Sequence, residues 1–328
     1  MHDIVVIGAS AGGIEALKEI TSNLAPDLDA AIFIVVHLSP ESSGLLPNIL
    51  NRHSKIPAHQ AEDGEAIRPR RIYVAPPDRH LLLESDQVRV VNGPRHNRHR
   101  PAIDLLFRTA ARHFTDRVVG AVLTGFLDDG SSGLLAIHNA GGATIVQSTD
   151  DAEVASMPKN ALEQVQPDYC VPLVEIADII NRLAGVEAKP MARRSNHKPE
   201  KKRVQTPFTC PDCHGTIWEV DENGEIRFEC RVGHAYSPEG MFQANDEDVE
   251  RSLWAALRSL EESAALERRL ANLADKRSRP HAYQRFAERA EERLRHAAIL
   301  REVLVGSKGK QSEAEGSDKT HAELEQLS

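Results

Sequence analysis

Three residue types that together carry out covalent hydrolysis each follow a short apolar run: Ser10, His37 and the pair Asp128 and Asp129. A serine hydroxyl is a weak nucleophile unless a histidine takes its proton, and the histidine needs a carboxylate to orient its ring. Where apolar runs form parallel strands, the residues at their carboxyl ends meet at one crevice. These residues are therefore candidates for a nucleophile, a general base and an orienting acid.

The turn that contains Ser10 is built of small residues, Gly-Ala-Ser-Ala-Gly-Gly over residues 8–13. Ser10 stands where a dinucleotide-binding turn would have its second glycine, and no Gly-Lys-Ser/Thr follows to make a P-loop. Glycines after a serine place a helix N-terminus and bare backbone N–H groups where an oxyanion would develop. The turn thus favours a nucleophile over a phosphate cradle.

A second group of reactive residues lies near the C-terminus, where Cys210 and Cys213 form a C-x-x-C pair and Cys230 precedes His234. This spacing predicts a Cys₃His structural zinc site, because each pair can supply one edge of a tetrahedron. A redox-active pair and simple packing are the alternatives, and His214 is the rival ligand. A closed site leaves no coordination position for substrate, so we expect zinc to hold the fold and no cofactor to serve catalysis.

Residues 1–185 alternate apolar runs with helix-period segments and are predicted to form one α/β domain. The runs are apolar on both faces, as in a doubly wound, mostly parallel sheet with helices on each side. The predicted strands are Ile4–Ile7, Ala31–Val36, Ile72–Ala75, Val118–Leu123, Ala143–Val146 and Tyr169–Pro172. The predicted helices are Ile14–Leu24, Ile103–His113 and Ser131–Asn139, and a β-hairpin is predicted for Leu81–Glu84 with Val88–Val91.

The composition changes after residue 185. Residues 186–206 hold seven Lys/Arg against two Glu and are predicted to be a basic linker, with a nucleic-acid or receptor-binding arm as the alternative. Residues 207–240 are predicted to form a zinc-ribbon-like module whose small core depends on metal. Residues 245–305 carry two amphipathic segments, predicted to form an α-helical hairpin that could self-associate. The polar tail, 306–328, is predicted to be disordered.

Bulk composition excludes several classes of protein. The formal net charge is −9 with a pI near 5.9, so no overall basic footprint draws the chain to nucleic acid. No run approaches the roughly 18 apolar residues of a membrane span, and the first strand is too short for a signal sequence. We therefore expect a cytoplasmic protein without direct membrane insertion and without a nucleic-acid partner.

Seven motifs together resemble the catalytic domain of the CheB-type chemotaxis protein-glutamate methylesterases, in the family's order over residues 1–184. They are GASAGG, VVHLSP, EDGE, IYVAPPDRHLLL, GPRHNRHRPAIDLLF, LTGFLDDG and AGGATIVQ. The resemblance implies a catalytic triad of Ser10, His37 and Asp129, the aspartate directly before glycine, rather than Asp128. It also implies backbone N–H groups near Ala11, Gly12 and Phe126 as the oxyanion hole.

The same resemblance implies an activity and partners. Members of the family remove methyl groups from methylated glutamates of chemoreceptors, and some deamidate receptor glutamines, within chemotaxis and phosphorelay signal transduction. The implied partners are the cytoplasmic domains of methyl-accepting chemoreceptors, together with a chemosensory methyltransferase or kinase. The alternative hypothesis is a catalytically silent docking or regulatory module of a chemosensory array.

Two features depart from the family pattern. Phe126 and Leu127 stand where the family commonly has Met-Gly, which predicts a bulkier rim around the substrate groove. Typical members also carry a phosphorylatable receiver domain ahead of the esterase, whereas the esterase pattern here begins at Met1. We therefore expect no receiver gating within this chain, and we expect residues 207–304 to act as the regulatory or targeting element instead.

Overall fold

The computed structural model describes residues 2–185, 201–222 and 225–324. The chain divides into two compact units, Met1–Phe242 and Gln243–Ser328.

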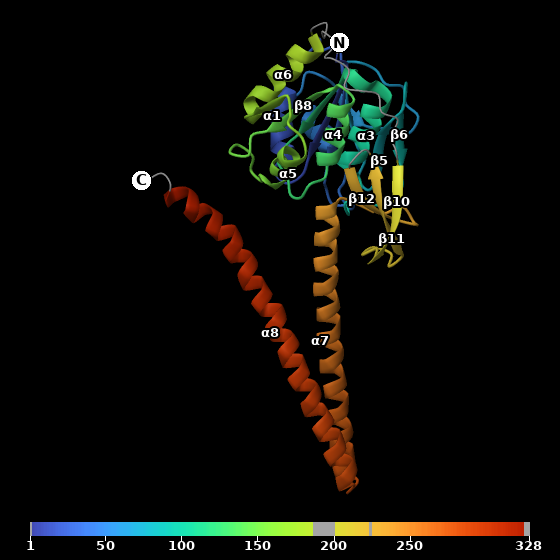
Figure 1. The fold of residues 1–328 in the computed structure, drawn as a ribbon, viewed down its shortest axis with the longest axis vertical. Helices are drawn as coiled ribbons and strands as arrows, with labels where there is room; N and C mark the ends of the chain where they lie inside the picture. Colours follow the sequence, from blue (N-terminus) through green and yellow to red (C-terminus); the bar gives the residue numbers. More distant parts are fainter. Residues whose placement is uncertain (1, 186–200, 223–224, 325–328) are drawn as a thin grey trace. The chain divides into compact units, whose positions relative to one another are not determined.

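A seven-stranded, wholly parallel sheet forms the centre of the first unit (Figure 1), in the order β3-β4-β2-β1-β7-β8-β9. Its strands are β1 Ile4–Ala9, β2 Ala31–Val36, β3 Ala58–Gln60, β4 Arg71–Val74, β7 Val118–Val122, β8 Ala143–Gln147 and β9 Tyr169–Val171. The chain leaves β1 toward β2 on one side and returns through β7 on the other, so the strand order switches direction at β1. The predicted doubly wound fold is confirmed; β3 was not predicted.

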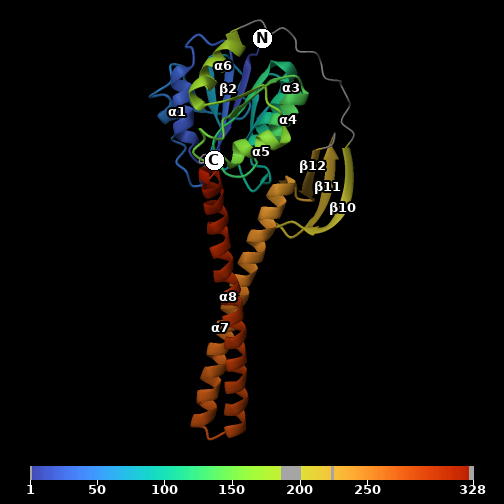
Figure 2. The same cartoon turned by 60° about the vertical axis from the view of Figure 1, so that its left-hand side comes forward.

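Helices cover both faces of this sheet, with α1 and α6 on one face and α3 and α4 on the other (Figure 2). Alternate side chains of β1 enter two separate cores, Val5 and Ile7 on the α1 side and Ile4 and Val6 on the α3 side, which is why the strand is apolar at every position. The helices are α1 Gly13–Asn23, α2 Leu46–Leu50, α3 Ile103–Phe114, α4 Ser131–Asn139, α5 Ser156–Gln164 and α6 Leu173–Gly185, with a 3₁₀ turn at Thr115–Arg117.

Two antiparallel sheets complete the first unit. The predicted hairpin is present as β5 His80–Leu83 and β6 Val88–Val91. The Cys/His segment forms a four-stranded sheet, with strands β10 Lys201–Thr209, β11 Thr216–Glu222, β12 Glu225–Cys230 and β13 Ala235–Tyr236. β10 begins inside the predicted linker because residues 201–205 pair with β11 and Arg203 lies over the Trp218 ring at 4.4 Å. The rest of that linker, 186–200, lies outside the described residues.

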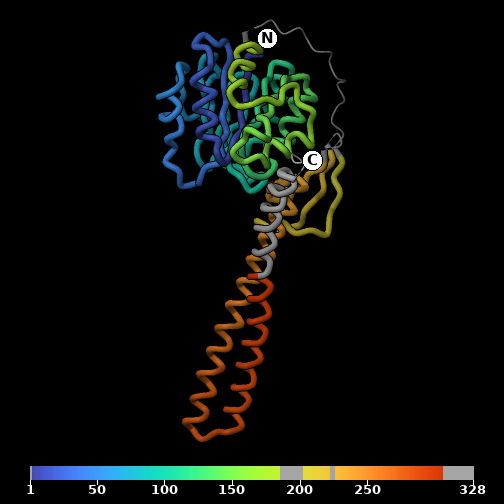
Figure 3. The backbone as a smooth tube through the Cα atoms, turned by 90° about the vertical axis from the view of Figure 1, so that its left-hand side faces the viewer, coloured from blue at the N-terminus to red at the C-terminus, as the bar shows by residue number. Residues whose placement is uncertain are grey.

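The second unit consists of two long helices, α7 Pro238–Lys276 from Gln243 onward and α8 Pro280–Leu324. They run antiparallel and side by side from the turn at 277–279 (Figure 3), and Leu257, Ala297 and Leu304 are buried together between them. α8 runs on to Leu324, past residue 306, where the polar tail was predicted to begin. Neither helix, in the residues that are described, is apolar enough over a long enough stretch to cross a membrane.

Candidate active site

Three adjacent strands bring the predicted catalytic residues to one edge of the sheet. Ser10 directly follows β1, His37 directly follows β2, and Asp129 lies in the loop after β7. Ala9 is paired with Val36 in the parallel register, so Ser10 and His37 are the next residues along two neighbouring strands. The His37 N–H donates to the Ala9 carbonyl at 3.1 Å, and the Ser10 N–H donates to the Thr124 carbonyl at 3.0 Å.

A short hydrogen bond joins His37 Nε2 to Asp129 Oδ2 at 2.8 Å, and the two side chains are 7% and 0% exposed. The carboxylate also lies at the N-terminus of α3, where Oδ2 accepts the Ile103 N–H at 2.7 Å and Oδ1 accepts the Asp104 N–H at 3.1 Å. Burial works to raise the pKa of Asp129, but the hydrogen bond and charge of His37 and the helix N–H groups hold it below its usual range. Asp129 is therefore an anion placed to orient the His37 ring.

The other ring nitrogen, His37 Nδ1, is buried with no hydrogen-bond partner. It is the nitrogen left to receive a proton, because Nε2 is occupied by Asp129. The strand register places Ser10 beside this ring, yet no hydrogen bond joins the serine hydroxyl to His37 in the part of the chain that is described. Catalytic hydrogen bonds are often long before substrate binds.

The turns after β1 and β7, near this edge of the sheet, hold three backbone N–H groups without an acceptor. Within the described residues, no hydrogen bond is made by the N–H of Ala11, Gly12 or Phe126. Gly12 has φ 75°, and a Cβ there would lie 2.6 Å from Glu153 Oε2, so this position needs glycine. Thr124 holds the turn after β1 in place, because its Oγ1 donates to the Ala11 carbonyl at 3.0 Å. These three N–H groups are the donors available to an oxyanion.

The loop that departs from the family pattern keeps a glycine-like backbone. Leu127 has φ 68°, in the left-handed region that a leucine enters at a cost of about 1–2 kcal/mol. Helix α5 holds it there, because Ser156 Oγ accepts the Leu127 N–H at 3.2 Å and Asn160 Nδ2 donates to the Leu127 carbonyl at 2.8 Å. Phe126 is 57% exposed, so its ring lies at the surface of this loop, where the sequence predicted a bulkier rim.

Asp128, the neighbour of Asp129, makes a different set of contacts. Its side chain is buried, and neither carboxylate oxygen makes a hydrogen bond of ordinary geometry within the described residues, although the side chain of Ser237 is near enough to oppose the rise in the pKa of Asp128. Burial, with the charge of Asp129 adding to it, raises the pKa of Asp128 to about 6. The structure thus places only the second aspartate of the pair against His37.

Asp128→Asn should stabilise the protein near pH 8 and have little effect near pH 4. A carboxyl whose folded pKa is raised contributes stability below its unfolded pKa and loses it as pH rises through the folded pKa, here between about 4 and 6. Above that window the buried charge is costly, so the amide should gain up to about 2–3 kcal/mol. Urea unfolding at both pH values measures this; an equal change at both would contradict it.

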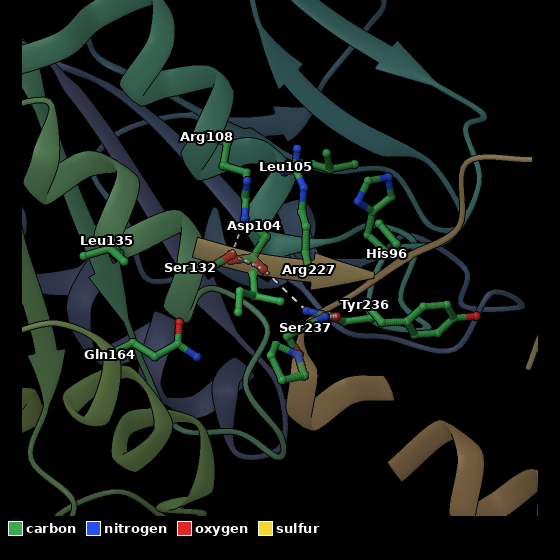
Figure 4. A pocket seen from close by; sticks show the side chains of 14 residues that line it. His96, Asp104, Leu105, Arg108, Ser132, Leu135, Gln164, Arg227, Tyr236 and Ser237 are labelled. Atoms are coloured by element: carbon green, nitrogen blue, oxygen red, sulfur yellow. Dashed lines mark hydrogen bonds between the residues drawn. The ribbon is translucent and has the colours of Figure 1, made fainter. Parts of the chain in front are cut away.

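The Asp104 carboxylate, at the start of α3, serves the Asp129 loop from the other side. Its Oδ1 accepts the N–H of Gly130 at 3.0 Å and of Gly133 at 2.7 Å. Its Oδ2 accepts the Ser132 hydroxyl at 2.9 Å, and that hydroxyl in turn accepts from Arg108 Nη2 at 2.7 Å (Figure 4). The periodicity of the sequence predicts that Asp104 lies in a helix. It does not predict the contacts of Asp104 with the loop after β7, because these depend on the tertiary fold.

The predicted metal ligands converge. The ligand atoms of Cys210, Cys213, Cys230 and His234 all lie within 4.8 Å of one another. Cys213 Sγ lies 3.6 Å from Cys230 Sγ, and His234 Nδ1 lies 3.7 Å from Cys210 Sγ and 3.5 Å from Cys230 Sγ. Tetrahedral zinc with Zn–S near 2.3 Å sets its sulfurs about 3.8 Å apart, so the cluster fits the ion. His214, the rival ligand, is not part of it.

The part of the chain that contains this site is similar to known proteins. The family model described as CheB methylesterase matches residues 5–180. A Leptospira interrogans protein provisionally named protein-glutamate methylesterase/protein-glutamine glutaminase is 40% identical over 183 residues, 56% of this chain and 95% of that protein. A Yersinia pestis protein named protein-glutamate methylesterase/protein-glutamine glutaminase is 40% identical over 163 residues, and the match spans 46% of its length.

A solved structure agrees. The Thermotoga maritima CheB methylesterase catalytic domain matches with a TM-score of 0.54 and 32% sequence identity, covering 56% of this chain and 99% of that domain. The matched part of this chain is the parallel-sheet domain with its strand-end site. The match to the family model ends at residue 180, before the Cys/His sheet and the two long helices begin.

Proposed function

The chain belongs to the CheB methylesterase family, and from that premise we propose that it hydrolyses glutamate γ-methyl esters on methylated chemoreceptors with Ser10, His37 and Asp129. The observation that carries the proposal is the 2.8 Å contact of His37 with Asp129, beside a serine at the end of the central strand. Side chains, backbone N–H groups and water are sufficient for this chemistry.

In this mechanism Ser10 Oγ attacks the ester carbonyl while His37 Nδ1 takes its proton. The N–H groups of Ala11, Gly12 and Phe126 hold the oxyanion. His37 then gives the proton to the departing methoxide, which leaves as methanol. Water, activated by the same nitrogen, cleaves the acyl-enzyme and restores Ser10, while Asp129 stabilises the imidazolium in both halves.

The same steps extend to glutamine side chains, where ammonia leaves in place of methanol, as the relatives' names indicate for those proteins. The partner is the methylated cytoplasmic region of a chemoreceptor, with a chemosensory methyltransferase or kinase as a further candidate. The proposal therefore places the chain in the cytoplasm.

The test combines a product with a covalent mark. The full chain is incubated with methylated receptor fragments and methanol is measured; a serine-directed phosphonofluoridate is then added and the modified peptide is identified by mass spectrometry. We expect methanol release that stops in step with modification of Ser10. Release that continues after Ser10 is fully modified would refute the proposal, and no release from unmodified enzyme would favour a silent docking module.

We further propose that the Cys/His cluster holds a structural zinc ion. Support comes from the convergence of three thiols and one imidazole nitrogen on a space of tetrahedral size and from the small apolar core of the sheet around it. Zinc bound there would close the turns 210–213 and 230–234, and all four ligands being protein atoms leaves no position for substrate.

Chelating the metal should unfold the Cys/His sheet and leave the parallel sheet intact. Small modules bind structural zinc with a free energy of about 10–16 kcal/mol, and this binding energy stabilises their folded state. In a Trp254→Phe background the only remaining tryptophan is Trp218 of β11, so its emission should shift on chelation and return with one equivalent of zinc. Cys213→Ser should lose the ion, whereas Cys170→Ser, an exposed cysteine outside the cluster, should keep it. An unchanged Trp218 spectrum in verified apoprotein would contradict this.

A further inference from the structure

A tight turn carries a second histidine onto the catalytic one. His96 and His99 exchange backbone hydrogen bonds of 3.2 and 2.8 Å, and the two residues between them, Asn97 and Arg98, have φ 45° and 67°. This is a two-residue hairpin turn of the left-handed type. It presents the His99 ring flat against His37, with ring centroids 3.6 Å apart and planes 5° from parallel.

Stacking on His99 restricts the tilt of the His37 ring about its hydrogen bond to Asp129. The ring has a single hydrogen bond, from Nε2 to Asp129, and its Nδ1 has none among the described residues. A ring held at one atom can tilt about that bond, and a parallel neighbour at van der Waals distance prevents the tilt. Burial lowers the pKa of His99 to about 3, so it stays neutral when His37 becomes an imidazolium.

The turn is held from the Cys/His module, within the same compact unit. The Asn97 N–H donates to the Ala235 carbonyl at 2.8 Å, and Asn97 Oδ1 accepts the Ser237 N–H at 2.8 Å. Ala235 directly follows the proposed metal ligand His234, whose carbonyl accepts the Cys230 N–H at 2.9 Å. One residue thus separates the metal cluster from the turn.

Two further contacts join the Cys/His module to the segment that carries the His96–His99 turn. Gly233 has φ 105°, and a Cβ on it would lie 3.0 Å from Pro94 Cγ, so the knuckle between the last two ligands packs directly on the segment that leads into the turn. Asn97 is 5% exposed, and its Nδ2 donates to Asp104 Oδ2 at 3.4 Å. Ser237 and Tyr236 of the module line the same cavity, of about 400 Å³, as Asp104 (Figure 4).

The base of the segment is fixed independently of the module. His80 Nε2 donates to the Pro94 carbonyl at 2.8 Å, and His80 Nδ1 accepts the Ala102 N–H at 3.2 Å. Arg100 adds two hydrogen bonds to Asp78, each 2.9 Å. The esterase domain itself therefore anchors both ends of the segment. The tip that bears His99 has two bonds of 2.8 Å to the module, at Ala235 and Ser237, and one longer bond, of 3.4 Å, to Asp104 of the esterase domain.

We propose that the metal-bound module is a positioning element of the esterase: by holding Asn97 it keeps His99 stacked on His37, so that metal occupancy sets the catalytic rate. His99 acts through His37 and is a positioning residue. The inference rests on the proposed esterase function and on the proposed metal site, and it joins the two.

The first experiment removes the metal from the full chain and follows two signals. Misplacing a catalytic group by about 1 Å can cost 10²-fold in rate, so kcat for methanol release should fall roughly 10- to 100-fold with little change in KM. Hydrogen exchange at residues 95–99 should rise, because the Asn97 N–H loses its acceptor, while exchange in β1 and β2 should stay slow. Zinc should reverse both changes. Unchanged or increased kcat in verified apoprotein would overturn the proposal.

The second experiment tests the turn itself with the metal in place. Asn97→Gly keeps the left-handed backbone and removes both side-chain bonds, and it should lower kcat while zinc content stays at one per chain. His99→Ala should lower kcat by a similar factor, and His99→Phe, a flat neutral ring, should restore most of it. A phenylalanine variant as slow as the alanine variant would overturn the stacking role.

The two proposals fail in different ways. If the wild-type chain releases no methanol in a Ser10-dependent manner, the esterase function fails, and the exchange signal at 95–99 alone decides whether the module holds the turn. If wild type is active and apoprotein is equally active, only the positioning role fails.

Discussion

Ser10→Ala should lower kcat for methanol release by roughly 10⁶-fold, the loss measured when the nucleophile of a comparable triad is removed. Without the hydroxyl no acyl-enzyme can form, and His37 and Asp129 have no proton to move. A residual rate above the uncatalysed reaction should remain, because the free N–H groups of Ala11 and Gly12 can still polarise the ester carbonyl.

The assay needs a control for loss of fold. Ser22→Ala changes another serine, on α1, whose hydroxyl donates only within its own helix, to the Glu19 carbonyl at 2.9 Å. It should keep wild-type kcat. Single-turnover methanol release and thermal unfolding are measured for both variants. A Ser10→Ala enzyme that is folded and within about tenfold of wild type would remove Ser10 from the mechanism.

Much of the fold could be predicted because a buried parallel strand leaves an unambiguous pattern. Ala31–Val36 and Ser131–Asn139 have the predicted bounds, since each is flanked by turn residues and packs an apolar face. β3 and α2 were not predicted, because they are three and five residues long, which is too short for a hydrophobic period to be recognised. Their positions come from pairing with β4 and packing on the α1 side of the sheet.

The site was predictable in its residue types and less so in its contacts. Ser10 and His37 follow from being the first polar residues after adjacent strands. Asp128 and Asp129 are equivalent in composition and differ only in which side of the loop faces α3, a tertiary property. The stacking of His99 depends on a left-handed turn at Asn97 and Arg98, which lacks the Asn-Gly signal of such turns, and on a module more than a hundred residues away in the sequence.

Asp129→Asn should lower kcat/KM by about 10⁴-fold, because an asparagine cannot satisfy the donors that surround this position. One carboxylate oxygen accepts from Ile103 N–H and His37, and the other accepts from Asp104 N–H. An amide offers one oxygen and one NH₂ group, so one helix N–H must face another donor. If the NH₂ faces His37, Nε2 must accept, the proton moves to Nδ1, and the ring can no longer take a proton from Ser10.

The neighbouring aspartate supplies the matched control. Asp128→Asn changes the same kind of side chain one residue away, where no contact with His37 is made, and it should keep kcat/KM within about tenfold of wild type. Asp129→Asn should also lose about 1–3 kcal/mol of stability from its unpaired buried donor, whereas Asp128→Asn gains stability near pH 8. In urea unfolding near pH 8, the free energy of unfolding should therefore fall for Asp129→Asn and rise for Asp128→Asn. In methanol release, the kcat/KM values of the two variants should differ by about three orders of magnitude. Equal loss of activity in both would mean that the loop as a whole matters, and that the carboxylate against His37 has no special role.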